Sequence, residues 1–169
     1  FPKIKINLLC AKDNIKLLEK QITVFKPNYV FLENEKKSYI LKKKITKETT
    51  ILNYNDLQKY LKESKSDYTI LSISGYKSLN FLENIVNNTK LLGLVSKEAI
   101  VSAGHLFNKS NKYKKTIIYP LDSEHFSIYK FLNLNKPRYQ IKNLFLTASG
   151  GPFLGKKYFN LKNISFEKA

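Results

Sequence analysis

Two carboxylates, a hydroxyl and an imidazole occupy consecutive positions in Asp122-Ser123-Glu124-His125, directly after the apolar run at residues 116–120. Carboxylate oxygens are ligands that hard divalent cations prefer. Residues two positions apart do not share a face of a helix, but at the end of a strand the carboxylates of Asp122 and Glu124 can face one cation. The alternative is structural: Asp122 caps a helix over residues 123–132 and Glu124 lies in its first turn. For the isolated pair, the helix start is the favoured interpretation.

Two further polar clusters follow predicted strands. Ser96-Lys97-Glu98 places a lysine and a carboxylate at the start of a helix, where anions also bind. In Ser149-Gly150-Gly151 the paired glycines let backbone amides approach a phosphate or a sugar. Taken singly, the first is an ordinary capped helix start and the second a tight turn. Three clusters in order, each at the end of a strand, favour a ligand site, because ligands of α/β proteins bind there.

The elements that must position these clusters alternate along the chain with short links. Apolar runs predict strands at residues 3–9, 29–32, 50–52, 68–73, 91–95, 116–119 and 144–147. Helical periodicity and capping residues predict helices at residues 14–25, 35–45, 56–64, 79–86, 96–107 and 123–132. Repeated βα units are typical of an α/β fold, here Rossmann-like, with a mostly parallel sheet and helices on both faces. The polar stretch at residues 108–115 is the predicted domain boundary.

Composition bounds the class of protein. The chain has 169 residues, 43% of them hydrophobic, which is enough for one ordinary domain or one domain and part of another. It has no apolar run of about 18 residues, so no membrane span is predicted, and its N-terminus lacks the pattern of a secretory signal. Cys10 is the single cysteine, which excludes an internal disulfide and fits a reducing compartment.

The formal net charge of +17 raises the question of nucleic-acid binding. Arg138 is the only arginine among 30 basic residues, whereas arginine is the side chain that binds phosphate and guanine in bidentate fashion. The lysines are spread over the whole chain and, with abundant Asn and Ile, indicate drift in an AT-rich genome. A lysine-rich nucleic-acid-binding module without catalysis is therefore the weaker alternative.

The three clusters resemble motifs of the 1-deoxy-D-xylulose 5-phosphate reductoisomerase family. Leu94 to Ala99 is similar to the family's Leu-Ala-Asn-Lys-Glu-Ser, Pro120 to His125 to its Pro-Val-Asp-Ser-Glu-His, and Ser149 to Phe153 to its Ser-Gly-Gly-Pro-Phe. Softer similarity covers the rest of the chain, including Ala11 to Asn14 against Ala-Gly-Lys-Asn. The resemblance implies a partial NADPH-binding Rossmann-like domain over residues 1–111, without its first βα unit. Residues 112–169 would begin an α+β catalytic, metal-binding domain.

The family's activity is a metal-dependent rearrangement and NADPH reduction of 1-deoxy-D-xylulose 5-phosphate to 2-C-methyl-D-erythritol 4-phosphate, in non-mevalonate isoprenoid biosynthesis. Carried over by position, the resemblance implies three groups of site residues. Asp122 and Glu124 would bind the metal (Mg or Mn). The sugar phosphate would contact Lys97, Ser123, Glu124 and Ser149, and of these Lys97 and Glu124 would be catalytic. The residues on the NADPH side would be Lys12, Asp13, Asn14, Ser96 and Glu98. His125 would support the turn.

Two places depart from the family pattern. Ser96 stands where the family has Asn, and its shorter side chain weakens one contact with the cofactor. Lys12-Asp13 stands where the family has Gly-Lys. A basic residue at the second position would favour the extra phosphate of NADPH and Asp13 would oppose it, while Lys12 can substitute from the adjacent position.

Several family motifs are not found in this sequence: the turn Gly-Ser-Thr-Gly-Ser-Ile-Gly, the third metal carboxylate, and the later His, Ser, Asn and Lys that bind the substrate phosphate. We therefore expect an internal fragment of the enzyme, truncated at both ends and inactive alone. The resemblance further implies a homodimer at full length, no nucleic-acid or membrane partner, and a location in the bacterial cytoplasm or a plastid-type organelle. Another Rossmann-type oxidoreductase acting on a different sugar phosphate is the alternative within the same class.

Overall fold

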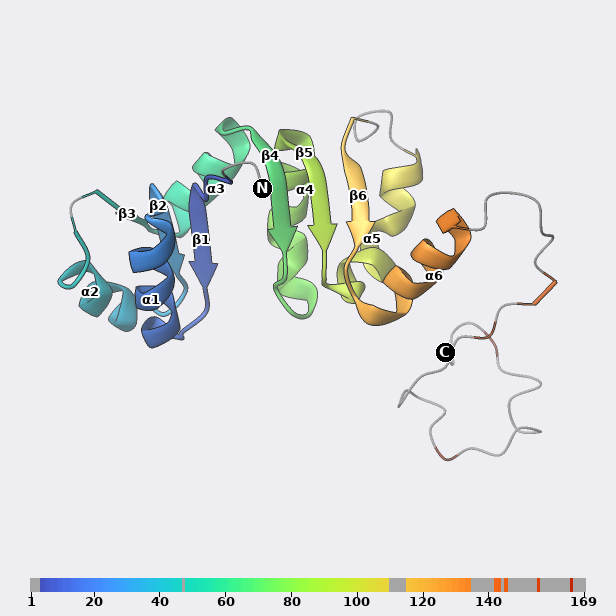
Figure 1. The fold of residues 1–169 in the computed structure, drawn as a ribbon, viewed down its shortest axis with the longest axis horizontal. Coiled ribbons are helices and arrows are strands. Elements are labelled where there is room, and N and C mark those ends of the chain that lie inside the picture. The colour runs from blue at the N-terminus through green and yellow to red at the C-terminus, as the bar shows by residue number, and fades with distance from the viewer. Residues whose placement is uncertain are drawn as a thin grey trace. The chain divides into compact units, whose positions relative to one another are not determined.

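The computed structural model describes residues 4–46, 48–109 and 115–134, with residues 142, 143, 145, 155 and 165 beyond them. Within these residues strands and helices alternate (Figure 1). The strands are β1 (Leu8–Ala11), β2 (Tyr29–Leu32), β3 (Thr50–Leu52), β4 (Ser66–Leu71), β5 (Thr89–Leu94) and β6 (Ile117–Pro120). The α-helices are α1 (Ile15–Phe25), α2 (Glu35–Lys42), α3 (Tyr54–Glu63), α4 (Leu79–Asn88), α5 (Lys97–Lys109) and α6 (Ser123–Leu134). A short 3-10 helix, η1 (Tyr76–Ser78), precedes α4.

The chain forms two compact units, residues 1–122 and residues 123–169, so that all these strands belong to the first unit and α6 to the second. The strands form two parallel sheets of three, which we name sheet A (β1-β2-β3) and sheet B (β4-β5-β6). In sheet A, Tyr29 lies between Leu8 and Thr50. In sheet B, Leu91 lies between Tyr68 and Ile117. The arrows of β1 and β4 point the same way (Figure 1), so the carboxyl ends of both sheets lie at one edge of the first unit.

Asparagine begins each of the first three helices. The side-chain oxygens of Asn14, Asn34 and Asn53 accept hydrogen bonds from backbone N–H groups three residues later, at 3.1, 3.1 and 2.9 Å. These bonds satisfy donors that the first turn of a helix leaves without an intrahelical partner. At the other end of α1, Lys26 adopts a left-handed conformation with φ of 45° and donates its N–H to the Ile22 carbonyl. Each asparagine cap fixes where its helix begins, and therefore where the loop after the preceding strand ends.

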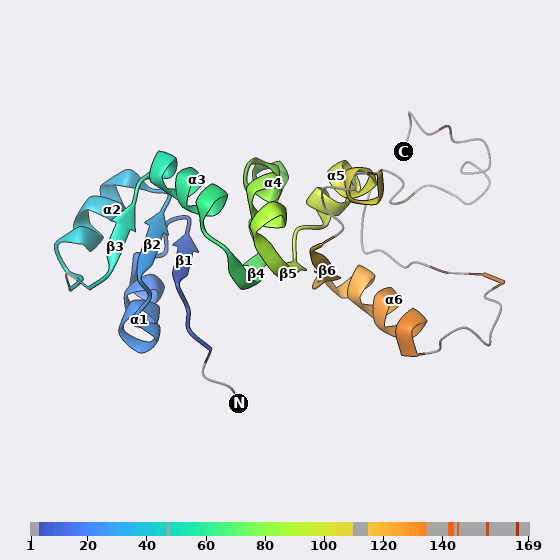
Figure 2. The ribbon, with the colours of Figure 1, turned by 90° about the horizontal axis from the view of Figure 1, so that it is seen from above.

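Alternating residues of sheet A bury both of its faces. On one face Val30 and Leu32 of β2 pack with Leu18 of α1 and Leu41 of α2. On the other face Phe31 joins the cluster that includes Leu57 of α3, Leu82 of α4 and Leu92 of β5. The second cluster thus continues from sheet A into sheet B and makes the first unit a single packed body. Helices α3, α4 and α5 lie along the same side of the sheets, and α1 lies on the opposite side (Figure 2).

Helices cover only one face of sheet B within the described residues. Leu71, Leu92 and Leu94 point into the cluster with α4 and α5, and each is at most 3% exposed. On the opposite face Tyr68 and Ile70 of β4 and Ile117 of β6 are 72, 70 and 58% exposed. Successive side chains of a strand point to opposite faces, so this contrast follows the strand period.

The predicted fold class is confirmed: both sheets are parallel, and helices cover both sides of the first unit. The predicted first strand at residues 3–9 was wrong, because β1 begins at Leu8. Its partner β2 begins only at Tyr29, after Pro27, so Ile4 has no strand to pair with and is 77% exposed. The predicted strand at residues 144–147 lies largely outside the described residues. The domain division at residue 111 stays a prediction, and no described helix is long and apolar enough to cross a membrane.

Candidate functional site

The carboxyl ends of the strands bring together the loops that the sequence singled out. Residues 12–14 follow β1, residues 72–75 follow β4, residues 95 and 96 follow β5, and residues 121 and 122 follow β6. Strands are added outward from β1 in sheet A and outward from β4 in sheet B, so the direction reverses between these two strands. Ligands of open α/β folds bind outside the carboxyl ends at such a reversal. The candidate site is therefore this edge of the first unit.

The hydroxyl of Ser96 is buried, with 4% of the residue exposed, and lies at the centre of a polar network. It donates to Oε2 of Glu98 at 3.0 Å and lies 3.1 Å from the hydroxyl of Ser78, which donates to the Gly75 carbonyl at 2.8 Å. The network ties the loop after β4 to the loop after β5. The network thus contains two predicted cofactor residues, Ser96 and Glu98, whereas no sequence pattern indicated the contact of Ser78.

The carboxylate of Glu98 is held in its charged form. Its own backbone N–H is the strongest cause, and the Ser96 hydroxyl is the next, with smaller contributions from the Lys97 ammonium and the Gly75 N–H. Together these groups lower the pKa of Glu98 below the usual glutamate range, because hydrogen bonds to the ionised form favour it. At neutral pH, Glu98 is therefore an anion, and its carboxylate accepts a hydrogen bond from the loop after β5.

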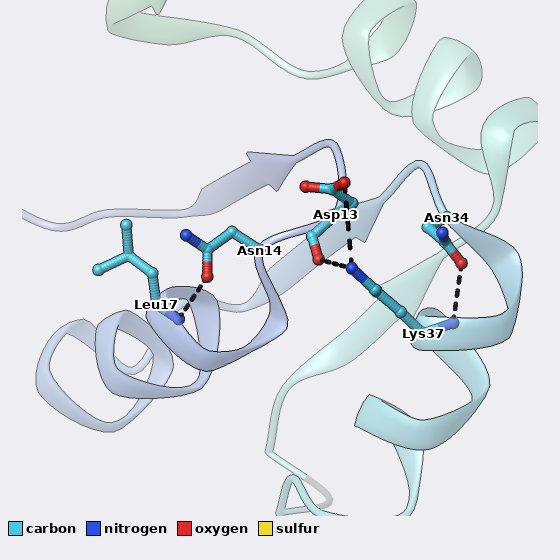
Figure 3. A network of polar contacts seen from close by, with 5 residues as sticks. All are labelled: Asp13, Asn14, Leu17, Asn34 and Lys37. Atoms are coloured by element: carbon cyan, nitrogen blue, oxygen red, sulfur yellow. Dashed lines mark hydrogen bonds and ion pairs between the residues drawn. The ribbon is translucent and has the colours of Figure 1, made fainter.

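The loop after β1 holds the other three predicted cofactor residues, Lys12, Asp13 and Asn14, of which Figure 3 shows the last two. The side chain of Asn14 accepts the N–H of Leu17 and so caps α1. The backbone carbonyl of Lys12 accepts the N–H of Asn34 at 3.0 Å, which joins this loop to the start of α2. Asp13 forms an ion pair with Lys37 of α2. The Lys37 ammonium donates to the Asp13 carbonyl oxygen at 2.8 Å and lies 3.9 Å from Oδ2 of the Asp13 carboxylate. Lys37 was not predicted from the sequence, because a contact across 24 positions leaves no local pattern.

A second ion pair connects the two sheets at the same edge. Nζ of Lys77, in η1 after β4, lies 2.7 Å from Oε1 of Glu33, which follows β2. The hydrogen bond to Glu33 is the main cause that raises the pKa of Lys77. The pair holds the start of the loop after β2 against η1, and neither residue was singled out from the sequence.

Asp122, one of the two predicted metal ligands, ends the first unit. The N–H of Leu121 donates to the Leu94 carbonyl at 2.8 Å, which extends the pairing of β5 and β6 by one residue. Gly93 leaves room for the Leu121 side chain, since a Cβ built on Gly93 would lie 2.6 Å from Cδ1 of that leucine. This packing fixes the backbone immediately before Asp122. Asp122 itself is partly buried.

The other predicted ligand, Glu124, lies in the first turn of α6 and belongs to the second unit. Its Oε2 accepts the hydroxyl of Ser123 at 2.6 Å. Among the residues that the structure describes, no three His, Cys, Asp or Glu side chains gather as a metal-binding group. Metal binding through Asp122 and Glu124 stays a prediction, as do the substrate contacts of Lys97 and Ser123. Ser149 lies outside the described residues.

Comparison with known proteins decides the family. A sequence model described as 1-deoxy-D-xylulose 5-phosphate reductoisomerase matches residues 1–104, and one for the C-terminal domain of that enzyme matches residues 118–169. The chain belongs to this family. Its reductoisomerase relatives include the protein of Thermodesulfovibrio yellowstonii, 38% identical over 100% of this chain and 44% of that protein. The protein of Pelagibacter ubique is 33% identical over 98% of this chain and 43% of its own length.

Solved reductoisomerase structures share the fold. One, determined in complex with magnesium, covers 98% of this chain with a TM-score of 0.72 and 29% identity, and the chain covers 44% of it. Another, in complex with NADPH, fosmidomycin and magnesium, covers 99% with a TM-score of 0.72 and 28% identity, and again 44% of that chain is matched. The chain therefore spans less than half the length of the reductoisomerases it matches. The match favours the reductoisomerase interpretation over the nucleic-acid-binding module.

Proposed function

We propose that this chain is part of a 1-deoxy-D-xylulose 5-phosphate reductoisomerase, an enzyme that uses NADPH and a divalent metal, Mg or Mn. The observation that carries the proposal is the register of β5 and β6. Leu94 pairs with Pro120, so Lys97 begins α5 three residues beyond one member of the pair and Asp122 lies two residues beyond the other. The residues that contain Lys97 and those that contain Asp122 therefore follow the carboxyl ends of two neighbouring strands, at the same edge of sheet B.

The cofactor side of the proposed site is the reversal between β1 and β4. NADPH bound there would meet the loop at residues 12–14 and the loop that Ser96 and Glu98 order. The donor set suits such a ligand, since hydroxyl, amide and ammonium groups bind the ribose and phosphate oxygens of a dinucleotide. Glu98 would contribute by holding its loop in place, because its carboxylate already accepts the Ser96 hydroxyl. NADPH supplies the hydride for the reductive step when it is bound.

The metal side would use the carboxylates of Asp122 and Glu124. Their oxygens fit Mg or Mn, both of which prefer oxygen ligands. A bound metal supplies a Lewis acid for the substrate carbonyl. The Ser123 hydroxyl, which donates to Glu124, would orient that carboxylate and contact the substrate. The ammonium of Lys97 would stabilise negative charge that develops on a substrate oxygen and would attract the sugar phosphate.

The finer properties of the whole enzyme follow from the family. Fosmidomycin is bound by the solved reductoisomerase noted above, and a sugar phosphate is the ligand we propose here. We further propose a homodimer at full length and a cytoplasmic location, since the relatives named above are bacterial.

The proposal can be tested in a full-length enzyme that carries this chain. In such a chimera, the chain replaces the aligned region of the Thermodesulfovibrio yellowstonii relative, which is 38% identical. With 1-deoxy-D-xylulose 5-phosphate and Mn, we expect the chimera to oxidise NADPH and the chain alone to show no turnover. Substitution Asp122→Asn should reduce kcat at least a hundredfold, because a carboxamide is a poorer ligand for a divalent cation than a carboxylate.

Two controls keep the result interpretable. Asp67→Asn removes a carboxylate that forms an exposed ion pair with Lys90 at the start of β4, and it should leave kcat within about twofold. Circular dichroism and thermal unfolding identify a chimera that has not folded. A folded chimera that binds NADPH but does not oxidise it with this substrate would overturn the proposal, as would full activity of the Asp122→Asn variant.

A further inference from the structure

The loop after β1 carries an acidic residue, Asp13, where the family pattern has a lysine. Asp13 follows Lys12 directly, so the two side-chain charges of the loop cancel. Left uncompensated, the Asp13 carboxylate would repel a phosphate on the adenosine ribose, the group that distinguishes NADPH from NADH. The Gly-Lys of the family supplies one positive charge at the same place.

Lys37 brings a further positive charge to this loop. It lies in the first turn of α2, where Asn34 accepts its backbone N–H at 3.1 Å and so fixes the start of the helix. Its ammonium donates to the Asp13 carbonyl at 2.8 Å and lies 3.9 Å from the Asp13 carboxylate (Figure 3). An ammonium has three N–H donors, and the two contacts with Asp13 use at most two of them. With Lys12, Asp13 and Lys37 together, the loop again carries one net positive charge.

This ion pair contributes little to the stability of the fold. The side chains of Lys37 and Asp13 are 41 and 58% exposed, and exposed ion pairs of this kind contribute little to folding. Another acidic group near the loop, Glu33, already has a partner in Lys77 at 2.7 Å. Lys37 is thus the cation whose position compensates Asp13.

We propose that Lys37 is a specificity-determining residue: by neutralising Asp13, it preserves the preference of this loop for the ribose phosphate of NADPH over the hydroxyl of NADH. The proposal rests on the proposed function, because it assumes that a dinucleotide binds at the reversal between β1 and β4. It goes beyond that function in assigning cofactor selectivity to a residue of α2 that lies 24 positions after the loop.

The test measures binding of NADPH and NADH without substrate, by nucleotide fluorescence, in the full-length chimera that carries this chain. Substitution Lys37→Met should weaken NADPH binding about tenfold, the change expected when one nearby exposed charge no longer faces a phosphate dianion. NADH binding should stay within about twofold. Lys36→Met is the matched control, since it removes the same charge from the adjacent, exposed position of the same turn and should alter neither affinity by more than about twofold.

A second variant separates charge compensation from other roles of Lys37. In the double substitution Asp13→Asn with Lys37→Met, Lys12 alone supplies the net positive charge, so the ratio of NADPH to NADH affinity should return to within about threefold of the parent value. The inference is overturned if Lys37→Met leaves that ratio unchanged, if it weakens both cofactors equally, or if the double variant does not recover the ratio. A folded parent chimera that binds neither nucleotide would instead overturn the proposed function, and the inference with it.

Discussion

Neighbouring residues have the same burial in β2 of sheet A and opposite burial in β4 of sheet B. In β2, Val30 and Phe31 point to opposite faces and are 0 and 9% exposed. In β4, Ile70 and Leu71 also point to opposite faces, but they are 70 and 3% exposed. All four of these side chains are apolar, so the difference lies in what covers each strand.

The direction of strand order explains this difference. Connections between parallel strands are right-handed, so reversing the direction in which strands are added puts the connecting helices on the opposite face. Helices α1 and α2 therefore cover one face of sheet A, and α4 and α5 cover the other side in sheet B. Helix α3 crosses from sheet A to sheet B and covers the second face of sheet A. Within the described part of the first unit, no helix does the same for the face of sheet B that carries Tyr68 and Ile70.

The reversal also creates the candidate site. The loops after β1 and β4 border it, and the network of Ser78, Ser96 and Glu98 stiffens its sheet B side. On the sheet A side, the contact of Lys37 with Asp13 joins α2 to the loop after β1. The same topological feature thus gathers the polar loops and leaves one face of sheet B without a covering helix in the part of the first unit that the structure describes.

The largest effect is expected for Phe31→Ala in sheet A. Phe31 lies in the cluster that the two sheets share, so its truncation removes packing from β2, α3 and the neighbouring strands together. We expect the free energy of unfolding of the chain to fall by about 3–5 kcal/mol, measured by urea denaturation. A loss below about 1 kcal/mol would show that the two sheets do not share one core.

The paired truncations Leu71→Ala and Ile70→Ala test the contrast within sheet B. Leu71 is buried against α4 and α5, and its truncation should cost about 2–5 kcal/mol of unfolding free energy. Ile70 is largely exposed, and its truncation should change that free energy by no more than about 0.5 kcal/mol. Equal losses in the two variants would mean that the face carrying Ile70 is covered in solution, and the difference between the sheets would then disappear.

Much of the fold could be predicted because its strands are short, apolar and sharply bounded. The strands at Tyr29–Leu32 and Thr50–Leu52 have the predicted boundaries. Helix α1 ends at Phe25 as predicted, and Asn14, predicted as its first residue, is its cap. The first strand was misplaced because the alternation of Ile4 and Ile6 satisfies the strand pattern, while only pairing with β2 decides where the strand starts. The local sequence pattern therefore predicts whether a segment is a strand or a helix better than it predicts which strand that segment pairs with.

The candidate site could be predicted only as far as its sequence clusters. The pattern located the loops that contain Asn14, Ser96 and Asp122, since each follows a predicted strand. The contacts that organise these loops join positions far apart in the chain: Ser78 to Ser96, Asp13 to Lys37, and Glu33 to Lys77. Such contacts depend on strand order, which no single segment encodes. Lysine is also so common in this chain that the contacts of Lys37 and Lys77 could not be predicted from residue type.

The smallest expected effect concerns the polar network beside sheet B. Removing the hydroxyl with Ser96→Ala deletes the side-chain hydrogen bond that lowers the pKa of Glu98, while the bond from the Glu98 backbone N–H remains. The pKa of Glu98, followed by NMR of its carboxyl carbon, should therefore rise part of the way toward its usual range. Because the folded-state pKa is below the unfolded one, the stabilising contribution is complete above the unfolded pKa, about 4.3. It is lost as pH falls through the folded value.

The parent chain should accordingly lose more stability than Ser96→Ala between about pH 5 and pH 3, a window that contains the unfolded glutamate pKa. Ser127→Ala is a matched control, since it deletes a serine hydroxyl that donates to the Ser123 carbonyl in α6 and is remote in sequence from Glu98. It should leave the pKa of Glu98 unchanged. An unchanged Glu98 pKa in Ser96→Ala would mean that the backbone N–H groups alone hold the carboxylate, and that the hydroxyl network does not stiffen the sheet B side of the reversal.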